Sequence, residues 1–498
     1  MNSTKRFLFI IVCVLNIQFT NAQSDNYWSW NFNTTSTLLA GAVVGGTAGP
    51  SAIYYNPALI DHENLPSLSL SANILSLQFF KAENIAGEGI DANKFIFKVQ
   101  PRFISYILPN KNDKIGFETA ILSPTSEEFT YTIQHFDELD LIQRTNGLET
   151  YSGYLKYNRK YDDTWVGFGA SYRLSDNVYI GASSFLSIKV LKYQFSRQTE
   201  AFQENDSVLV NDILEPRYIA MNSFEEEMKY WDLSFIFKLG AQYKTNNERF
   251  GVGANITFPN IPFIGQADVR KAWNRSNIYD NSAGQFTAND VFIGFEEDIK
   301  PRIITPFSTA LGIQYFTASR KNSISFTIEY FAGIDPYAVI EPYGEVSGLP
   351  DLMEDLINPS DVMSYYTEAK SVTNLAIGFK QYFSPTFFFL GGFRTDFTSG
   401  KTDDIRFIGN KFKLNQIHVN KYHITLGPVL TLKKFQVITG LQYSLGRNRD
   451  IPQVVNYSDP FEYIPVTRQA LEGLRENTVN TKVNELAFFF GAIIDLTR

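Results

Sequence analysis

Cysteine and histidine are almost absent from this sequence. Among 498 residues there is one cysteine, Cys13, inside an apolar N-terminal segment and without the small residue just before it that a lipoprotein signal would show. The remainder of the chain can therefore form no disulfide framework and no cysteine-based metal or nucleophilic site. Of the four histidines, His418 and His423 are five apart on one expected strand, so they face opposite sides and cannot share a metal ion. His62 and His135 have no catalytic partners nearby in the sequence, which favours surface or interface roles.

The motifs of nucleotide-dependent and hydrolytic enzymes are also missing. The sequence has no Walker loop, no Gly-x-Ser-x-Gly elbow and no His-Glu-x-x-His motif. We therefore expect a protein that is not an enzyme and that carries no cofactor. Three acidic clusters, at 225–227, 296–298 and 351–355, offer the carboxylate oxygens that calcium prefers. Each lacks the alternating ligand spacing of a calcium loop, which favours solvated charge over a metal site.

The N-terminus has the features of a secretory signal peptide over residues 1–22. Lys5 and Arg6 precede the apolar run FLFIIVCVL at 7–15, and the small-residue cleavage site Thr-Asn-Ala follows at 20–22. This apolar run is too short to cross a bilayer as a helix. Removing Lys5 and Arg6 from the 44 basic residues leaves the 52 acidic residues in excess by ten. An exported acidic chain argues against nucleic acid as a partner.

Long hydrophobic runs are absent from the rest of the chain, and this excludes a helical membrane protein. Apolar and polar residues alternate instead, in a chain rich in Phe (43) and Tyr (27). Within 231–245, Phe235, Phe237 and Leu239 share one face, while Ser234 and Lys238 share the other. Residues 248–258 repeat the pattern with glycines on the polar face, and only the turn TNNE separates the two segments. The pair is a hairpin with one apolar and one polar face.

Fourteen segments show this alternation, and their connections vary in length in a regular way. We predict strands at 66–80, 94–108, 114–123, 164–174, 177–191, 231–245, 248–258, 302–317, 321–333, 371–383, 386–398, 416–432, 435–446 and 482–496. Six very short connections alternate with seven longer ones, the pattern of periplasmic turns and extracellular loops. Aromatic residues bracket the short turns, as an interfacial girdle requires. The predicted fold class is all-β, a transmembrane antiparallel β-barrel of about 14 strands.

Some residues leave alternatives open. The stretch YSGYLKYNRKY at 151–161 fits either an additional strand or a hairpin raised above the membrane. Lys238, Glu329, Lys380 and Asp495 lie on polar strand faces and are possible lumen-lining residues of a substrate path. Any polar barrel interior needs such residues, so their presence alone does not identify a path.

Residues 23–65 precede the first strand and contain the sequence LLAGAVVGGTAGPSAIYYNPALI. They are too few and too glycine-rich for a domain, so we expect a hatch that plugs the lumen of a barrel formed by 66–498. Pro57 fixes its own φ and pushes Asn56 toward an extended conformation, and the side chain of Asn56 can bond to nearby backbone. These residues predict a rigid hatch–barrel joint. Tyr54 and Tyr55 would pin it to the inner wall, and Ala58 would allow close approach.

The stretch SAIYYNPALI at 51–60, followed by LPSLSLSANI at the first strand, resembles the FadL/TodX family of outer-membrane transporters for long-chain fatty acids and other hydrophobic compounds. The resemblance implies a fourteen-stranded barrel with an N-terminal hatch. It also implies that a hydrophobic solute leaves sideways, near a kinked third strand, when the hatch shifts. By position this strand includes 114–129, and Pro124 is the expected kink because it cannot donate a ladder hydrogen bond. Pro124 as the simple end of the strand is an equal alternative.

The leading hypothesis is passive uptake of hydrophobic compounds through the cell outer membrane, with outer-membrane lipid and a hydrophobic small molecule as partners. The alternative is a non-transporting accessory barrel in a multi-protein outer-membrane secretion or assembly complex. Long loops would serve as a ligand lid in the first case and as a docking surface for other outer-membrane proteins in the second. An outer-membrane hydrolase is a third hypothesis, disfavoured because no catalytic triad is recognisable.

Overall fold

The structure, a computed structural model, describes residues 26–46, 48–60, 66–142, 147–202, 208–210, 213–215, 219–342, 361–401, 407–408, 411–413 and 418–496. The expected signal peptide, His62 and the acidic cluster at 351–355 lie outside these residues. Fourteen antiparallel strands close into a barrel in chain order, which confirms the predicted fold class. They are β1 (Ser67–Glu83), β2 (Ala92–Leu108), β3 (Ile115–Leu139), β4 (Glu149–Arg173), β5 (Val178–Phe202), β8 (Ile219–Lys244), β9 (Phe250–Thr257), β14 (Ser308–Phe316), β15 (Asn322–Phe331), β18 (Val372–Ser384), β19 (Phe387–Asp396), β22 (Asn420–Thr431), β23 (Phe435–Ile451) and β26 (Val479–Asp495).

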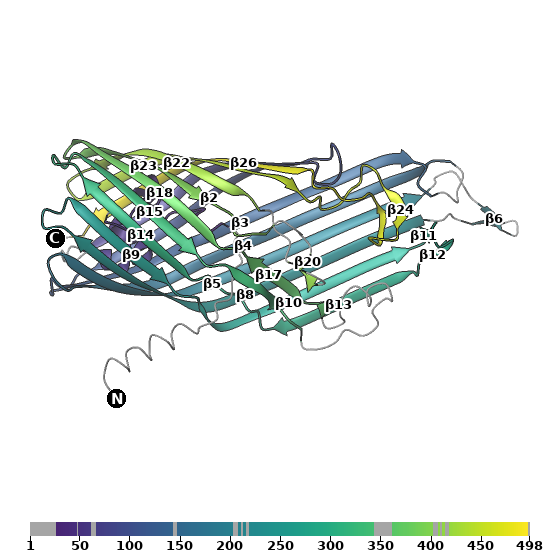
Figure 1. Cartoon of the computed structure of the whole chain (residues 1–498), viewed down its shortest axis with the longest axis horizontal. Helices are drawn as coiled ribbons and strands as arrows, with labels where there is room; N and C mark the ends of the chain where they lie inside the picture. Colours follow the sequence, from purple (N-terminus) through teal and green to yellow (C-terminus); the bar gives the residue numbers. More distant parts are fainter. Residues whose placement is uncertain are drawn as a thin grey trace, which may run out of the picture.

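Two further strands extend one side of the barrel. β10 (Ile261–Ser276) continues along β8 beyond the end of β9, and β13 (Asp290–Ile299) pairs with β10. Together with the distal parts of β3, β4, β5 and β8 they form a six-stranded sheet, here called the raised sheet, which projects past the rest of the barrel (Figure 1). Five short hairpins complete the described strands: β6 (Val208–Val210) with β7 (Ile213–Glu215), β11 (Tyr279–Asp280) with β12 (Gln285–Phe286), β16 (Ile334–Ile340) with β17 (Tyr365–Ala369), β20 (Phe407–Ile408) with β21 (Lys411–Phe412), and β24 (Phe461–Ile464) with β25 (Gln469–Glu472).

The raised sheet differs from the sequence-based expectation of long loops. β3, β4 and β5 have 25 residues each, or roughly 80 Å at about 3.3 Å per residue, whereas a barrel strand crosses a bilayer in about 9–11 residues. Residues 151–161 are therefore the distal half of β4, and neither a separate strand nor a hairpin. The long connection expected between the predicted strands 248–258 and 302–317 is not a simple loop, because it contains β10 and β13.

The outward face of the barrel changes character along the strands. On β4, Val166 and Phe168 face outward and are 40% and 51% exposed, whereas Lys160 and Asp162 occupy the outward positions further along. The apolar outward positions of neighbouring strands continue this band around the barrel, and they include Ile180, Trp231, Phe237, Ile313, Ile377 and Phe490. Such a band is what a barrel presents to lipid. We call the end with the short turns the turn end, and the opposite end the loop end.

The inward face of the raised sheet is covered by the hairpins β16–β17 and β24–β25. The hydroxyl of Tyr151 donates to the carbonyl of Leu471 (2.8 Å), and Asn222 Nδ2 donates to the carbonyl of Ala470 (3.0 Å). Tyr151, Ala470 and Leu471 belong to a large buried cluster rich in tyrosine. Burial raises the pKa of the Tyr151 phenol well above its ordinary range, so it remains a hydrogen-bond donor. The loop end is therefore a packed core.

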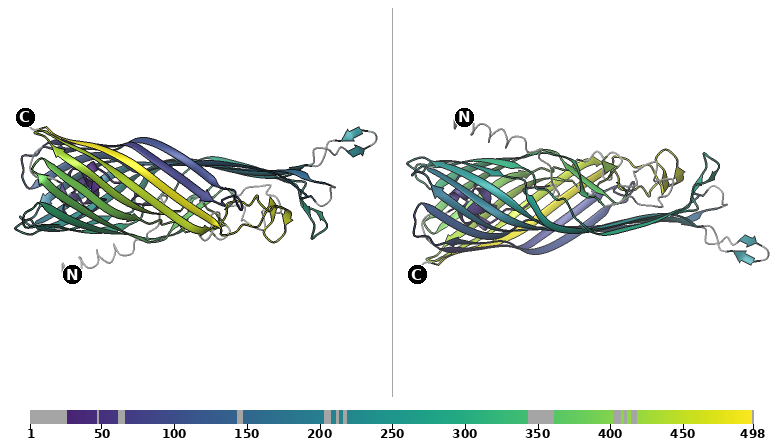
Figure 2. Two further views of the ribbon diagram at one scale, coloured as in Figure 1. Left: turned by 90° about the horizontal axis from the view of Figure 1, so that it is seen from above. Right: turned by 90° about the horizontal axis from the view of Figure 1, so that it is seen from below.

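The N-terminal residues 26–46 and 48–60, here called the plug, fill the lumen toward the turn end (Figure 2, purple). The plug contains α2 (Thr34–Leu38), η1 (Gly49–Ser51), α3 (Ala52–Tyr55) and η2 (Pro57–Leu59). Glycines on the inner wall allow its backbone to approach. A Cβ on Gly253 would lie 1.9 Å from the carbonyl oxygen of Val44, and one on Gly312 would lie 2.4 Å from the amide nitrogen of Gly45. The glycines on the polar strand faces therefore make room for the plug.

Candidate functional site

The corner at Asn56 is built as the sequence pattern suggests, but it lies deep inside the barrel. Asn56 is extended (φ −161°, ψ 101°), and its Oδ1 accepts from the amide of Ala58 (3.1 Å), which caps η2. Its Nδ2 donates to the carbonyls of Val44 (3.0 Å) and of Ala241 on β8 (3.1 Å). One buried side chain therefore ties two parts of the plug to the wall.

Replacing Asn56 with alanine is expected to destabilise the plug by about 2–4 kcal/mol, because a cap is lost and two buried carbonyls lose their donor. The measurement is hydrogen exchange of the amides of residues 48–60. Asn112→Ala is the matched control, since Asn112 makes a similar backbone contact at an exposed turn. Unchanged exchange in Asn56→Ala would contradict the assigned role.

The other predicted joint residues divide between plug and wall. The ring of Tyr54 packs against Trp165 of β4, with centroids 5.7 Å apart, and beneath the Lys238 ammonium at 4.1 Å. Tyr55 instead donates to Asn31 Oδ1 within the plug (2.9 Å). A Cβ on Gly181 of β5 would come within 2.3 Å of Pro57 and 2.5 Å of Ala58, so both lie directly against the wall. The corner thus contacts β4, β5 and β8 and lies within the plug.

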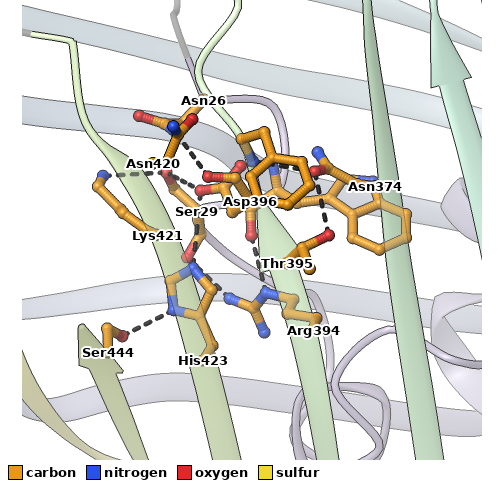
Figure 3. A network of polar contacts seen from close by, with 12 residues as sticks. Asn26, Ser29, Asn374, Arg394, Thr395, Asp396, Asn420, Lys421, His423 and Ser444 are labelled. Atoms are coloured by element: carbon orange, nitrogen blue, oxygen red, sulfur yellow. Dashed lines mark hydrogen bonds and ion pairs between the residues drawn. The ribbon is translucent and has the colours of Figure 1, made fainter. Parts of the chain in front are cut away.

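A buried polar cluster, which the sequence did not point to, holds the first residues of the plug (Figure 3). Asp396 on β19 accepts from the amide of Trp28 (3.0 Å) and from the hydroxyl of Ser29 (2.9 Å). Arg394, two residues earlier on the same face, donates from Nε to the carbonyl of Trp28 and from Nη2 to the carbonyl of Ser29, both at 2.9 Å. We call these four residues the clamp. It fixes two consecutive plug residues through both their donors and their acceptors.

His423 lies beside the clamp, and its surroundings resemble a hydrolytic arrangement only superficially. Its Nδ1 is 2.7 Å from the hydroxyl of Ser444, but its Nε2 is 3.6 Å from Asp396, too far for a hydrogen bond. Asp396 already binds the plug, and Ser444 is not among the residues that line the adjacent cavity. The cluster is better explained as an attachment of the plug than as a catalytic triad.

Arg394→Met is expected to lower the free energy of unfolding by about 3–5 kcal/mol, because it leaves the carbonyls of Trp28 and Ser29 without their charged donor and removes a buried cation near Asp396. Urea titration with a gel-shift readout of the folded barrel measures this change. Arg320→Met is the control, since Arg320 forms an exposed ion pair with Glu248 (3.6 Å) that is worth about 0–1 kcal/mol. Equal stability of the two variants would refute the importance of the clamp.

The barrel wall is interrupted between β2 and β3. The two strands pair only from Phe103 opposite Leu122 to Leu108 opposite Phe117. Beyond these pairs, among the described residues, Ala92–Pro101 of β2 pairs only with β1, and Thr125–Leu139 of β3 pairs only with β4. We call this interruption the wall gap.

Pro124 lies where the wall gap begins. The register between β3 and β4 shifts between Leu122 and Thr125, and β3 then continues to Leu139, so Pro124 does not end the strand. A second shift between β1 and β2 leaves Arg102 without a register partner, and its guanidinium lies 3.7 Å over the ring of Trp30 in the plug. Bulges bend strands and interrupt pairing. The register shifts at Arg102 of β2 and at Pro124 of β3 therefore border the gap, and Arg102 contacts the plug.

Two small cavities connect the wall gap with the plug. The first, of about 110 Å³, is lined by Lys98 of β2, Phe129 of β3 and Trp30 of the plug, among others. The second, of about 80 Å³, is lined by Tyr54, Pro124, Lys238 and Glu329, among others. Four residues from the sequence-based prediction therefore meet around one cavity. A third cavity, of about 820 Å³, opens at the turn end beside Gly45 and Gly46 of the plug.

The four predicted lumen residues differ in position. Glu329 accepts from Trp28 Nε1 (2.7 Å) and from the Ser308 hydroxyl (2.7 Å), so it holds the plug and also lines the second cavity. Lys380 lies near the turn end, over the rings of Tyr382 and Phe388. Asp495 is the last residue of β26, also at the turn end. The structure brings Lys238 and Glu329 together and leaves Lys380 and Asp495 apart from them.

No helix in the described part of the chain is long and apolar enough to cross a membrane. The described residues also contain no group of three or more His, Cys, Asp or Glu side chains that could hold a metal ion. The acidic clusters at 225–227 and 296–298 lie on β8 and β13, and His135 lies on β3.

The structure is a closed fourteen-stranded barrel with an internal plug and a wall that is interrupted between β2 and β3. Neither a protein-family model nor a curated protein sequence matches this chain. Its fold is that of the FadL/TodX transporters. A FadL homologue from Pseudomonas aeruginosa superposes with a TM-score of 0.56 at 12% identity, covering 96% of this chain and 100% of the homologue. The toluene transporter TodX of P. putida gives 0.54 at 13% identity, covering 95% and 100%, and the toluene transporter TbuX of Ralstonia pickettii gives 0.52 at 12% identity, covering 94% and 99%.

Proposed function

We propose that this protein lies in the cell outer membrane and admits hydrophobic compounds, such as long-chain fatty acids or aromatic hydrocarbons, which leave sideways through the wall gap. The observation that carries the proposal is the end of β2–β3 pairing at Phe103 and Leu122, beside a cavity that the plug also lines. Outer-membrane barrels have their short turns in the periplasm, so the turn end would face the periplasm and the loop end would face the outside of the cell. The proposed substrate class is supported by the proteins that share this fold, which include a FadL homologue and toluene transporters.

The small size of the two cavities supports the proposal that passage depends on movement of the plug. At about 110 and 80 Å³ they are smaller than the 300–1,000 Å³ usual for small-molecule sites. Trp30 and Asn26 line the cavity next to the gap. Arg394 and Asp396 hold Trp28 and Ser29, which lie between them, and the carbonyl of Asp396 accepts from Asn26 Nδ2. Release of residues 26–30 would enlarge the path from the lumen to the gap, and no energy source is required for such diffusion.

The wall gap also opens toward an apolar surface. On β2, Phe95, Phe97 and Val99 face outward next to the gap and are 53–63% exposed. These residues lie on the gap side of the last paired residue, Phe103. A hydrophobic compound leaving there would meet lipid, in which its transfer from water is favourable.

The test compares cells that lack the protein with cells that regain it. Uptake of radiolabelled oleate and toluene is expected to fall at least tenfold on deletion and to recover with the wild-type chain, while uptake of a small sugar stays constant. Unchanged oleate and toluene uptake would overturn the proposal.

An accessory subunit of a larger outer-membrane complex is the second candidate, favoured by the raised sheet and the packed loop end. A sheet that extends well beyond the apolar band is unnecessary for diffusion, but it offers a large polar surface to other proteins. Mild extraction and sizing distinguish the candidates. A lone barrel with bound lipid supports transport, and a stable complex with no effect of deletion on uptake supports the accessory role.

A further inference from the structure

β13 is the free edge of the raised sheet. Among the described residues it pairs with β10 on one side and with no strand on the other. The strand is held firmly, because Phe292 stacks on Trp273 of β10 with ring centroids 4.0 Å apart. Both residues lie in the buried cluster under the raised sheet. A fixed strand with an open edge is a template for pairing with another chain.

The outward side chains of β13 are apolar although their surroundings are not. Val291, Ile293 and Phe295 are 66%, 70% and 57% exposed. Phe295 lies opposite Arg270 of β10, and Arg270 forms an ion pair with Glu225 of β8 (3.8 Å). Charged neighbours show that this stripe lies outside the lipid-facing band, so lipid does not account for it.

Along residues 291–295 the edge strand lacks the features that usually protect an edge. It contains no proline and no charged residue there, and its outward side chains are all apolar. Its membrane-proximal end carries Glu297 and Asp298, both exposed, with Asp298 at positive φ (59°) beside a register shift. An incoming strand therefore meets apolar side chains along most of its length and negative charge at one end.

A second copy of this chain does not fit the edge. Antiparallel self-pairing needs a two-fold axis perpendicular to the sheet. The raised sheet runs along the barrel axis (Figure 1), so this rotation would turn the second barrel upside down, which a common membrane forbids. A two-fold axis along the strand would instead place the outward face of one sheet beside the inward face of the other.

We propose that β13 binds an extended segment of a different protein as an additional strand outside the membrane. The segment would be apolar at alternate residues, to cover Val291, Ile293 and Phe295, and basic at the end that lies beside Glu297 and Asp298. Main-chain hydrogen bonds supply affinity in such strand addition, while alternate side chains and charge supply specificity. This interaction goes beyond the transport proposal and does not depend on its substrate.

The test uses purified full-length protein in detergent micelles and a fluorescent ten-residue peptide that alternates valine and threonine and ends in two lysines. We expect micromolar binding by anisotropy, together with slower hydrogen exchange of the amides of Asp290–Ile299. A peptide that ends in two glutamates should bind at least tenfold more weakly. A peptide of the same composition with its valines grouped together should bind no better than the glutamate peptide.

Ile293→Lys and the milder Ile293→Thr should each weaken binding at least tenfold. Ile219→Lys is the matched control, because Ile219 is an exposed apolar residue of the same sheet (49%) away from the edge. Absent binding, or equal loss in the control, overturns the proposal. Protection, in the isolated protein, of those β13 amides that do not point toward β10 would assign the edge to another part of this chain, and dimers abolished by Ile293→Lys would assign it to a second copy. Either result also overturns the proposal. Oleate uptake measured on the same variants should be unchanged, which separates failure here from failure of the transport proposal.

Discussion

Gly312→Val is expected to unseat the plug and to make the barrel leaky while leaving it folded. Gly312 faces the lumen on β14, and an added Cβ would lie 2.4 Å from the amide nitrogen of Gly45 and 2.8 Å from the carbonyl carbon of Val44. Backbone atoms at such distances must move. Valine itself suits a β-strand, so the wall should still form. We expect sensitivity to a large hydrophilic antibiotic to rise at least tenfold.

The control for this variant is Thr309→Val on the outward face of the same strand. Both proteins should keep the heat-modifiable gel migration of a folded barrel. Unaltered antibiotic sensitivity in Gly312→Val, with unaltered exchange of the plug amides, would show that the plug tolerates the side chain and does not seal the lumen at this contact.

A crosslink across the wall gap is expected to abolish lateral exit. Cysteines at Val99 of β2 and Glu128 of β3, joined by a flexible bismaleimide, would tether the unpaired parts of the two strands. We expect oleate uptake to fall at least tenfold, an increase of about 1.4 kcal/mol or more in the barrier. The chemistry is specific because the only natural cysteine, Cys13, lies in the expected signal peptide.

The matched crosslink joins Thr119 and Phe168, which are direct register partners on β3 and β4. It adds the same reagent to two strands that are already paired, so uptake should not change. Equal loss in both crosslinked proteins would mean that the reagent stiffens the barrel generally, and loss in neither would remove the gap from the path.

Alternation predicted the barrel well because each strand has one face toward lipid and one toward the lumen. Each of the fourteen predicted segments overlaps one of the fourteen barrel strands, and the polar face of 248–258 carries Gly251 and Gly253, which contact the plug. The raised sheet was missed because beyond the apolar band the outward face becomes polar, as in Lys160 and Asp162 of β4, and resembles a loop. The inward tyrosines continue the alternation there and were the available signal.

The candidate site could be predicted only in part. Asn56 and Pro57 act locally, so their backbone geometry follows from the sequence. The clamp joins Trp28 to Asp396, which are 368 residues apart, and no local pattern pairs them. One signal was available: Arg394 and Asp396 place opposite charges on the same inward face of a strand. The wall gap depends on which strands fail to pair, and alternation within each strand carries no information about that.

Photolabelling with a diazirine-bearing hydrocarbon tests the lateral route most directly. In proteoliposomes loaded from the loop end, we predict labels on Trp30 and Phe129 beside the inner side of the gap, and on Phe97 at its outer side. The bismaleimide bridge between β2 and β3 should remove the Phe97 label and leave that on Trp30. Labels confined to Phe316 and Tyr382 at the turn end, with none at Trp30, Phe129 or Phe97, would contradict exit through the wall.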